Sequence, residues 1–324
     1  MTKQQLNRRI ATVVALALVT AACGGTGSDG ATTTETPTTT TTVGATTTST
    51  AAPAVSQPTT TTPASTTTTS TLPPPATNGV IVGFEGVMGW WDGSDWRTLE
   101  DGEPPAEDGD VFQVLRIGEP ATAVLGGPVT AGCEFIEGSR FIDLGLDIDT
   151  WPSPTPIAVS TDDELVPHPV ELLPTPPAVY TGIVSNLLAA RGVVDPDPPI
   201  VQVIRTDLEG DGVDEVLIAA ERNDTGSLNP AATGDYSILL LRKIVQGDVQ
   251  TAIIADFIIE PPVVEGSIIA LDTLRFTTVA DFNGDGKMEI AYTSQYYEGS
   301  STHLVEYVND DLGPVEVLAV GCGV

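Results

Sequence analysis

The chain has 324 residues, of which 44 are Asp or Glu and 13 are Lys or Arg, so its formal net charge at pH 7 is −31. Nucleic-acid binding depends on basic side chains that neutralise phosphates, so this balance argues against a nucleic-acid partner and against electrostatic attachment to anionic lipid. Cations are the counterpart that such an acidic protein attracts.

Residues 1–23 have the pattern of a bacterial export signal. A basic start that includes Lys3 and Arg8 precedes an apolar run, residues 10–19, that is too short to span a bilayer. The run ends Leu-Val-Thr-Ala-Ala-Cys-Gly-Gly, which resembles a lipobox with Cys23 as the lipidated residue. We therefore expect a protein anchored by lipid at the extracytoplasmic face of the membrane. Cleavage at an Ala-x-Ala-like site followed by free secretion is the alternative.

Residues 24–77 consist almost entirely of Thr, Ser, Pro, Ala and Gly. Such a composition buries too little apolar surface to offset the entropy of the chain, so we expect a disordered, extended stalk between the anchor and the folded part.

Residues 78–174 are expected to form an N-terminal β-rich region. Its β-branched and aromatic runs predict strands at 80–85, 90–91, 96–99, 112–117, 121–125, 140–146 and 157–160. All four Trp lie here: Trp90, Trp91, Trp96 and Trp151. Clustered Trp side chains either stack on sugar rings or fill a core, and the sequence leaves both readings open.

Residues 175–324 are expected to hold one linking helix followed by two repeats. Thr175 is the predicted helix cap, the two prolines after it suit a first turn, and Arg191 with Gly192 marks the end. Each repeat is predicted to have four strands. The ranges are 201–206, 215–221, 236–244 and 250–259 in the first, and 275–280, 289–297, 303–308 and 316–320 in the second.

A nine-residue acidic loop joins the first two predicted strands of each repeat, at residues 207–215 and 281–289. Each loop carries oxygen-bearing side chains at positions 1, 3, 5 and 9 and glycine at positions 4 and 6. Alternate oxygens on a loop that glycine allows to curl suit Ca²⁺, which takes six to eight hard oxygen ligands. An EF-hand is excluded, because position 12 is Ile218 or Tyr292 rather than Glu, and strands rather than helices flank the loops.

The pattern Asp-x-(Asp/Asn/Glu)-Gly-Asp-Gly-x-x-Glu between strands resembles the FG-GAP/VCBS repeat of integrin-α-like β-propellers and bacterial surface lipoproteins. The resemblance covers roughly residues 200–324 and implies two propeller-blade-like repeats that bind Ca²⁺. The ligands it implies are Asp207, Glu209, Asp211, the Val213 carbonyl and Glu215, then Asp281, Asn283, Asp285, the Lys287 carbonyl and Glu289.

The first loop departs from the family pattern in two ways. Glu209 is longer than the usual residue at position 3, and Asp214 could compete with Glu215 as the ligand at position 9. Two blades do not close a propeller, so either the N-terminal region supplies more sheet or the blades pack face to face as an open sandwich.

If Cys23 is lipidated, Cys133 and Cys322 remain as a pair in an oxidising compartment. We expect a disulfide between them, which would tie the N-terminal region to the end of the chain. Free buried thiols are the alternative.

The sequence points to no reaction. A catalytic triad would need His168 or His303 beside a serine and a carboxylate, and no Gly-x-Ser-x-Gly turn is present. A glycosidase needs only two carboxylates, which abound here, so an exported hydrolase acting on polysaccharide is the alternative function. The favoured expectation is a Ca²⁺-binding β module for adhesion, binding or structure, with a glycan or protein of the cell wall or its surroundings as ligand.

Overall fold

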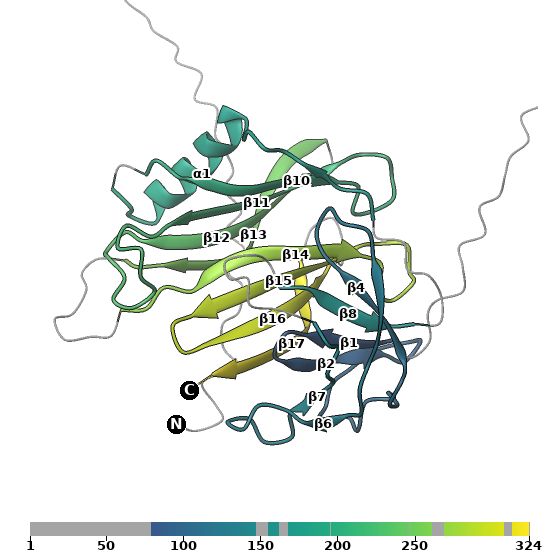
Figure 1. Cartoon of the computed structure of the whole chain (residues 1–324). Coiled ribbons are helices and arrows are strands. Elements are labelled where there is room, and N and C mark those ends of the chain that lie inside the picture. The colour runs from purple at the N-terminus through teal and green to yellow at the C-terminus, as the bar shows by residue number, and fades with distance from the viewer. Residues whose placement is uncertain are drawn as a thin grey trace, which may run out of the picture. The chain divides into compact units, whose positions relative to one another are not determined.

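The computed structural model describes residues 79–146, 155–161, 168–194, 196–245, 247–260, 269–307 and 313–323. They form a mostly β structure with one α-helix and four antiparallel sheets (Figure 1). The export signal with Cys23, the Thr-rich stalk and Trp151 lie outside the described residues. Within the described ranges, no helix is both long and apolar enough to cross a membrane.

The N-terminal sheet contains six strands in the order β3-β2-β1-β8-β4-β5, and a separate hairpin pairs β6 with β7. The bounds are β1 Val80–Gly83, β2 Gly86–Trp91, β3 Trp96–Arg97, β4 Val111–Leu115, β5 Thr122–Leu125, β6 Thr130–Ala131, β7 Arg140–Phe141 and β8 Ile157–Ser160. The β-rich character expected for this region is confirmed. The predicted strand 140–146 is reduced to the two residues of β7.

The first repeat sheet has the order β13-β12-β11-β10-β9, and the second has the order β14-β15-β16-β17. Their bounds are β9 Glu171–Leu172, β10 Ile200–Thr206, β11 Glu215–Arg222, β12 Tyr236–Val245, β13 Asp248–Ile258, β14 Thr273–Ala280, β15 Glu289–Tyr296, β16 Gly299–Glu306 and β17 Val315–Gly323. Both predicted sets of four strands are therefore confirmed as antiparallel meanders. The short β9 had no signal in the sequence.

The single helix, α1, spans Ala178–Ala190 and begins later than predicted. Thr175 does not cap it: Pro177 occupies the cap position, with ψ at 139° and no side-chain cap hydrogen bond. A proline disfavours helical geometry in the residue before it, which is consistent with Pro176, the residue before Pro177, lying outside the helix. The predicted end is confirmed, since Arg191 is the C-cap and Gly192 has a φ of +85°.

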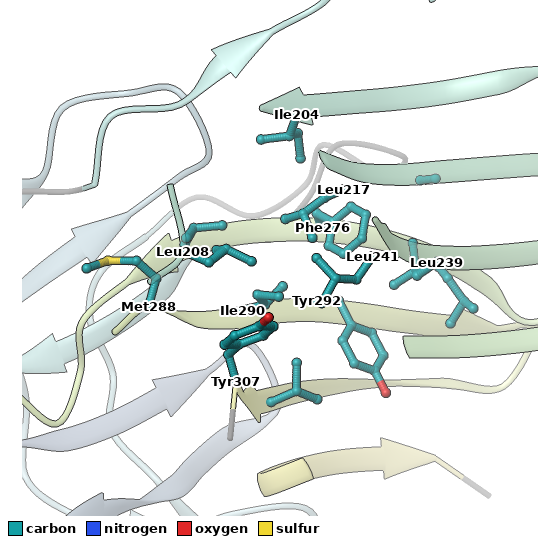
Figure 2. Close-up of a cluster of buried hydrophobic side chains, with 14 residues drawn as sticks. Ile204, Leu208, Leu217, Leu239, Leu241, Phe276, Met288, Ile290, Tyr292 and Tyr307 are labelled. Atoms are coloured by element: carbon teal, nitrogen blue, oxygen red, sulfur yellow. The ribbon is translucent and has the colours of Figure 1, made fainter. Parts of the chain in front are cut away.

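Among the buried apolar clusters of the described residues, three join one layer of the structure to the next. The largest core lies between the two repeat sheets and includes Leu217 and Leu241 from one and Phe276 and Ile290 from the other (Figure 2). A second core joins the opposite face of the second repeat sheet to the N-terminal sheet. The third packs α1 on the outer face of the first repeat sheet, where Leu188 is fully buried. Apolar area removed from water, at about 25 cal/mol per Å², is the main force behind each layer.

The second repeat sheet is thus buried on both faces, between the first repeat sheet and the N-terminal sheet. Successive residues of its strand β15 show this directly, because Ile290 and Tyr292 enter one core while Ala291 enters the other. Of the two arrangements left open by the sequence, both contribute: the N-terminal region adds a sheet, and the sheets pack face to face. In the described ranges the sheets stay open and form no propeller.

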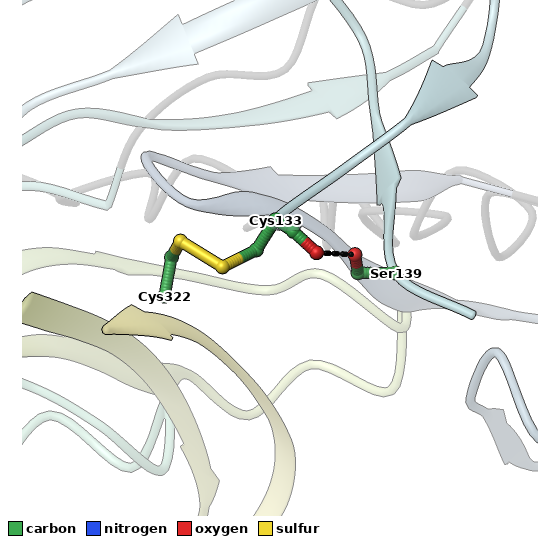
Figure 3. Close-up of a disulfide and its surroundings, with 3 residues drawn as sticks. All are labelled: Cys133, Ser139 and Cys322. Atoms are coloured by element: carbon green, nitrogen blue, oxygen red, sulfur yellow. Dashed lines mark hydrogen bonds between the residues drawn. A yellow bond between two sulfur atoms is a disulfide. The ribbon is translucent and has the colours of Figure 1, made fainter. Parts of the chain in front are cut away.

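A disulfide joins Cys133, in the loop after β6, to Cys322 on β17 (Figure 3). The two Cα atoms are 5.6 Å apart and the residues are separated by 189 positions in the chain. The Ser139 hydroxyl donates a hydrogen bond of 3.0 Å to the Cys133 carbonyl, which holds the loop on the N-terminal side. The expected pairing is confirmed, and free thiols are excluded.

Candidate metal centre

The two acidic loops lie at matching places in the two repeat sheets. Residues 207–214 connect β10 to β11, and residues 281–288 connect β14 to β15. The predicted strand–loop–strand frame is therefore confirmed.

Aspartate at position 1 organises each loop by accepting hydrogen bonds from its backbone. In the first loop Asp207 accepts from the amides of Asp211 and Gly212, at 3.1 and 2.8 Å. In the second loop Asp281 accepts from the amides at the same positions, Asp285 and Gly286, at 3.1 and 2.9 Å. The two loops thus adopt one backbone design, which their shared sequence register predicts.

Glycine is required at positions 4 and 6 because the backbone enters the left-handed region there. Gly210 and Gly212 have φ of +72° and +86°, and Gly284 and Gly286 have φ of +75° and +87°. Residues with a Cβ rarely adopt this conformation, so the curl of each loop depends on these glycines.

Glutamate at position 9 closes each loop by accepting a hydrogen bond from the backbone amide at position 2. Oε2 of Glu215 accepts from the Leu208 amide at 2.9 Å, and Oε2 of Glu289 accepts from the Phe282 amide at 2.7 Å. Leu208 and Phe282 are both buried in the inter-sheet cores, so they anchor position 2. Glu289 is fully buried, and its second oxygen, Oε1, has no hydrogen-bond partner.

The closing glutamates have raised pKa values. Burial raises the pKa of Glu215 to about 7, and the carboxylates of Glu209, Asp211 and Asp207 add to the shift. Burial raises the pKa of Glu289 well above its ordinary value, with further repulsion from Asp281 and Asp285. Burial is the main cause of both shifts, and the charges of the other loop acids add to it. A bound cation would favour the ionised form of each glutamate.

The two candidate ligands at the end of the first loop have different partners. Asp214 forms an ion pair with Arg205, with Oδ2 2.7 Å from Nη2. Glu215 is only 3% exposed and closes the loop.

Glu306, a carboxylate that lies beside the second loop, belongs to no motif, so the sequence did not identify it. Glu306, at the end of β16, accepts a hydrogen bond of 3.1 Å from Nδ2 of Asn283, and its charge contributes to the raised pKa of Glu289. Asn283 is thereby oriented, with its own Oδ1 accepting from the Asp285 amide at 2.9 Å. Only strand pairing in the sheet brings Glu306 to this place.

The two loops also touch. The Met288 amide donates a 2.9 Å hydrogen bond to the Leu208 carbonyl. A Cβ on Gly210 would lie 3.5 Å from the Gly286 carbonyl oxygen. The two motifs, which belong to different repeats, therefore contact each other in the fold, and neither motif predicts this contact alone.

The acidic side chains of the loops do not form a preformed metal-binding cluster in the structure. Among the described residues, no three His, Cys, Asp or Glu side chains form a group that could hold a metal ion. The aspartates at positions 1 and 5 instead bond to the amides of their own loops, and Asp211 and Asp285 are exposed. The feature that fits a cation is the buried, unpartnered Oε1 of Glu289 beside Asp281 and Asp285.

The Trp residues and the surface hollow, which are the features relevant to a polysaccharide hydrolase, give that alternative little support. Trp90 is buried in the core of the N-terminal sheet, and Trp91 and Trp96 pack edge to face with centroids 5.1 Å apart. A surface hollow contains two acids, Asp256 and Glu260, but Asp256 is paired with Arg191 at 3.0 Å.

Comparisons of the chain with protein-family models, with curated proteins and with solved structures gave no match. The resemblance of the two loops to FG-GAP/VCBS repeats therefore stays a prediction that rests on the loop motif.

Proposed function

We propose that this protein is a calcium-binding β module of the bacterial cell surface, in which the two acidic loops bind Ca²⁺ and stiffen the edge of the stacked sheets. The ion at the second loop would be held by Asp281, Asn283, Asp285, the Lys287 carbonyl and Glu289. At the first loop the ligands would be Asp207, Glu209, Asp211, the Val213 carbonyl and Glu215. Bound calcium would supply charge neutralisation and rigidity here, and no reaction is assigned to it.

The observation that carries the proposal is the Glu289 carboxyl. It is 0% exposed, its Oε1 has no partner, and the charges of Asp281, Asp285 and Glu306 help to raise its pKa. An unpartnered polar oxygen in the interior costs free energy, and so does a buried carboxylate without a counter-charge. A cation at this place satisfies both. Asp285 is exposed and its Oδ1 accepts from the Lys287 amide, so its carboxylate would have to turn inward to share the ion with Glu289.

The repeated design of the loops supports the same function. Both use the same amide-to-carboxylate bonds, the same pair of left-handed glycines and the same closing glutamate. The four-stranded meanders that carry the loops are compatible with blade-like FG-GAP/VCBS repeats. A lipid on Cys23 and the stalk of residues 24–77 would hold this module away from the membrane, where it would bind a glycan or protein or serve the envelope as a structural element.

Calcium titration of the chelator-treated protein tests the proposal. Ca²⁺ should raise the melting temperature, because a ligand that binds only the folded state stabilises it by about 2.7 kcal/mol at a hundredfold excess over Kd. Asp285→Ala should remove most of the shift that belongs to the second loop. Asp248→Ala, at the exposed start of β13, is the matched control and should leave the shift intact. A melting temperature and binding heat that stay unchanged on adding Ca²⁺ to the wild-type protein would refute the calcium site.

A further inference from the structure

Three side chains on the second repeat sheet form a continuous hydrogen-bonded chain. The hydroxyl of Ser301 lies 2.7 Å from Nε2 of His303, and Nδ1 of His303 lies 2.7 Å from Oε2 of Glu316. Ser301 and His303 are two residues apart on β16, so strand alternation places them on one face. Glu316 comes from β17. The arrangement is independent of the calcium loops.

A strand irregularity is what brings Glu316 to the histidine. The register of β16 with β17 shifts between Leu304, which pairs with Leu318, and Val305, which pairs with Glu316. In a regular ladder Val317 would lie opposite Val305 and Glu316 would point to the other face. Val317 instead packs on the apolar core shared with the N-terminal sheet, and Glu316 lies on the face of His303. Such bulges commonly re-aim a side chain beside a functional site.

The imidazole is held in one plane by an aromatic neighbour. Tyr292, the cross-strand partner of His303 on β15, stacks on it with ring centroids 4.6 Å apart and an interplanar angle of 8°. Tyr292 is only 6% exposed and belongs to the core between the repeat sheets (Figure 2). The ring is therefore positioned by a rigid element rather than by a loop.

The two hydrogen bonds fit one direction of proton transfer, in which the tautomer of His303 is the one that donates to Glu316. An ionised Glu316 only accepts, so Nδ1 of a neutral His303 carries the proton and donates it. Nε2 is then the acceptor and takes its hydrogen bond from the Ser301 hydroxyl. This is the order that a nucleophile, a general base and an orienting carboxylate require.

Ser301 is half-buried, and the β17 strand beside it carries small residues. Its cross-strand neighbour there is Gly321, and the neighbour of His303 is Ala319, which is exposed. A Cβ on Gly321 would lie 3.1 Å from that of Ser301, so a larger residue at position 321 would crowd the serine. The His303 side chain remains 19% exposed and that of Glu316 51% exposed.

We propose that Ser301, His303 and Glu316 form a serine-hydrolase triad that acts on carboxylic esters. Ser301 Oγ attacks the ester carbonyl carbon while its proton passes to His303 Nε2, and Glu316 stabilises the imidazolium. The bond to the alcohol oxygen breaks, and the alcohol leaves with the proton from Nε2. Water then gives a proton to Nε2, attacks the acyl-serine and releases the acid, and Ser301 regains its proton.

The negative charge that develops on the carbonyl oxygen needs a donor. β16 is paired on both sides, so its amides belong to the ladders. The donor therefore comes from a side chain, and Ser294 supplies a hydroxyl on the same face directly opposite Ser301. In the structure this hydroxyl donates a 3.3 Å hydrogen bond to Asp272, and in the proposed mechanism it would donate to the oxyanion instead.

Labelling with a fluorophosphonate probe tests the triad. The probe phosphonylates an activated serine with loss of fluoride, and peptide mass spectrometry locates the adduct. The exported, purified protein should carry one adduct, on the peptide that contains Ser301. Ser301→Ala should abolish it, and His303→Ala should slow labelling about 100-fold, the contribution expected of a general base.

Ser300→Ala is the matched control, because its side chain faces the other side of the sheet, and it should be labelled at the wild-type rate. Hydrolysis of p-nitrophenyl acetate should follow the same order among the variants. An unlabelled wild-type protein overturns the proposal, and so does an adduct whose rate of formation is unchanged in His303→Ala. If a variant fails to fold, labelling of the wild-type protein at Ser301 still tests the proposal.

Discussion

The backbone amide of Met288 donates a 2.9 Å hydrogen bond to the backbone carbonyl of Leu208, and this bond joins the two acidic loops. Met288 directly precedes the closing Glu289, and Leu208 directly follows Asp207. Ordering one loop therefore orders part of the other, which is the condition for coupled binding.

We predict that the two loops bind calcium with positive coupling. Asp207→Ala, which disables the first loop, should also weaken binding at the second by about fivefold, the lower end of typical coupling between sites. Isothermal titration calorimetry of the variant measures the remaining Kd. Asp248→Ala controls for the loss of a negative charge elsewhere. Identical affinity of the second loop in wild type and Asp207→Ala would show that the loops act separately.

Calcium binding should release protons in mildly acidic solution. The pKa of Glu215 is raised to about 7 by burial and by neighbouring acids, so its carboxyl is largely protonated at pH 6 and must ionise to bind the ion. At pH 6 the Glu215→Gln variant should release about one proton fewer than wild type. Titrations in buffers of different ionisation enthalpy measure this number. Equal proton release by both proteins would contradict the assignment.

Without calcium, the same residue should make stability depend on pH. A carboxyl whose pKa is higher in the folded chain stabilises the fold fully below its unfolded value. That contribution is lost as the pH rises through the folded value. For Glu215 the window runs from about 4.5 to about 7. Added Ca²⁺ should reverse the loss, as melting curves across this range would show.

Glu85 should impose a similar cost that calcium does not relieve. It is 7% exposed, burial raises its pKa, and one of its oxygens has no partner, while Oε2 accepts a 2.8 Å bond from Thr302. Glutamine keeps an acceptor for Thr302 and carries no charge. Glu85→Gln should therefore raise the melting temperature at pH 8 and have little effect near pH 4.5. Exposed Glu100→Gln serves as control. A lower melting temperature at pH 8 would argue that the charge is needed.

Gln202 should be essential for docking the two repeat sheets. Its side-chain amide donates to the Phe276 carbonyl at 3.0 Å, and its oxygen accepts from the Phe276 amide at 2.9 Å. Gln202→Ala leaves both groups of Phe276 without these partners and should lower the free energy of unfolding by about 1–3 kcal/mol. Denaturant unfolding measures the change, with Val201→Ala, a partly exposed neighbour, as control. Equal stability of the two variants would deny the bridge a stabilising role.

The Cys133–Cys322 disulfide should contribute substantially to stability. It closes a loop of 189 residues in the unfolded chain, and the chain-entropy estimate for such a loop is about 5 kcal/mol. The double variant Cys133→Ser/Cys322→Ser should unfold at a lower denaturant concentration by an amount approaching this value. Loss of less than 1 kcal/mol would mean that the unfolded chain is already compact without the bond.

Local sequence alone determined the strands of both repeats, the end of the helix and the curled shape of the acidic loops. These features follow from short-range physics, such as alternation of β-branched residues and left-handed glycines at Gly210 and Gly284. The start of the helix was missed because the Pro176–Pro177 pair outweighed the capping preference of Thr175.

Only the tertiary structure determined which residues that are distant in the sequence contact each other. The contact between the loops and the position of Glu306 depend on sheet stacking and strand register, as does the meeting of Ser301 with His303 and Glu316. The last of these depends on a bulge of a single residue at Val317, which moves Glu316 to the other face of the sheet. No local pattern encodes such a shift, because the packing of Val317 in a core built by distant strands determines it.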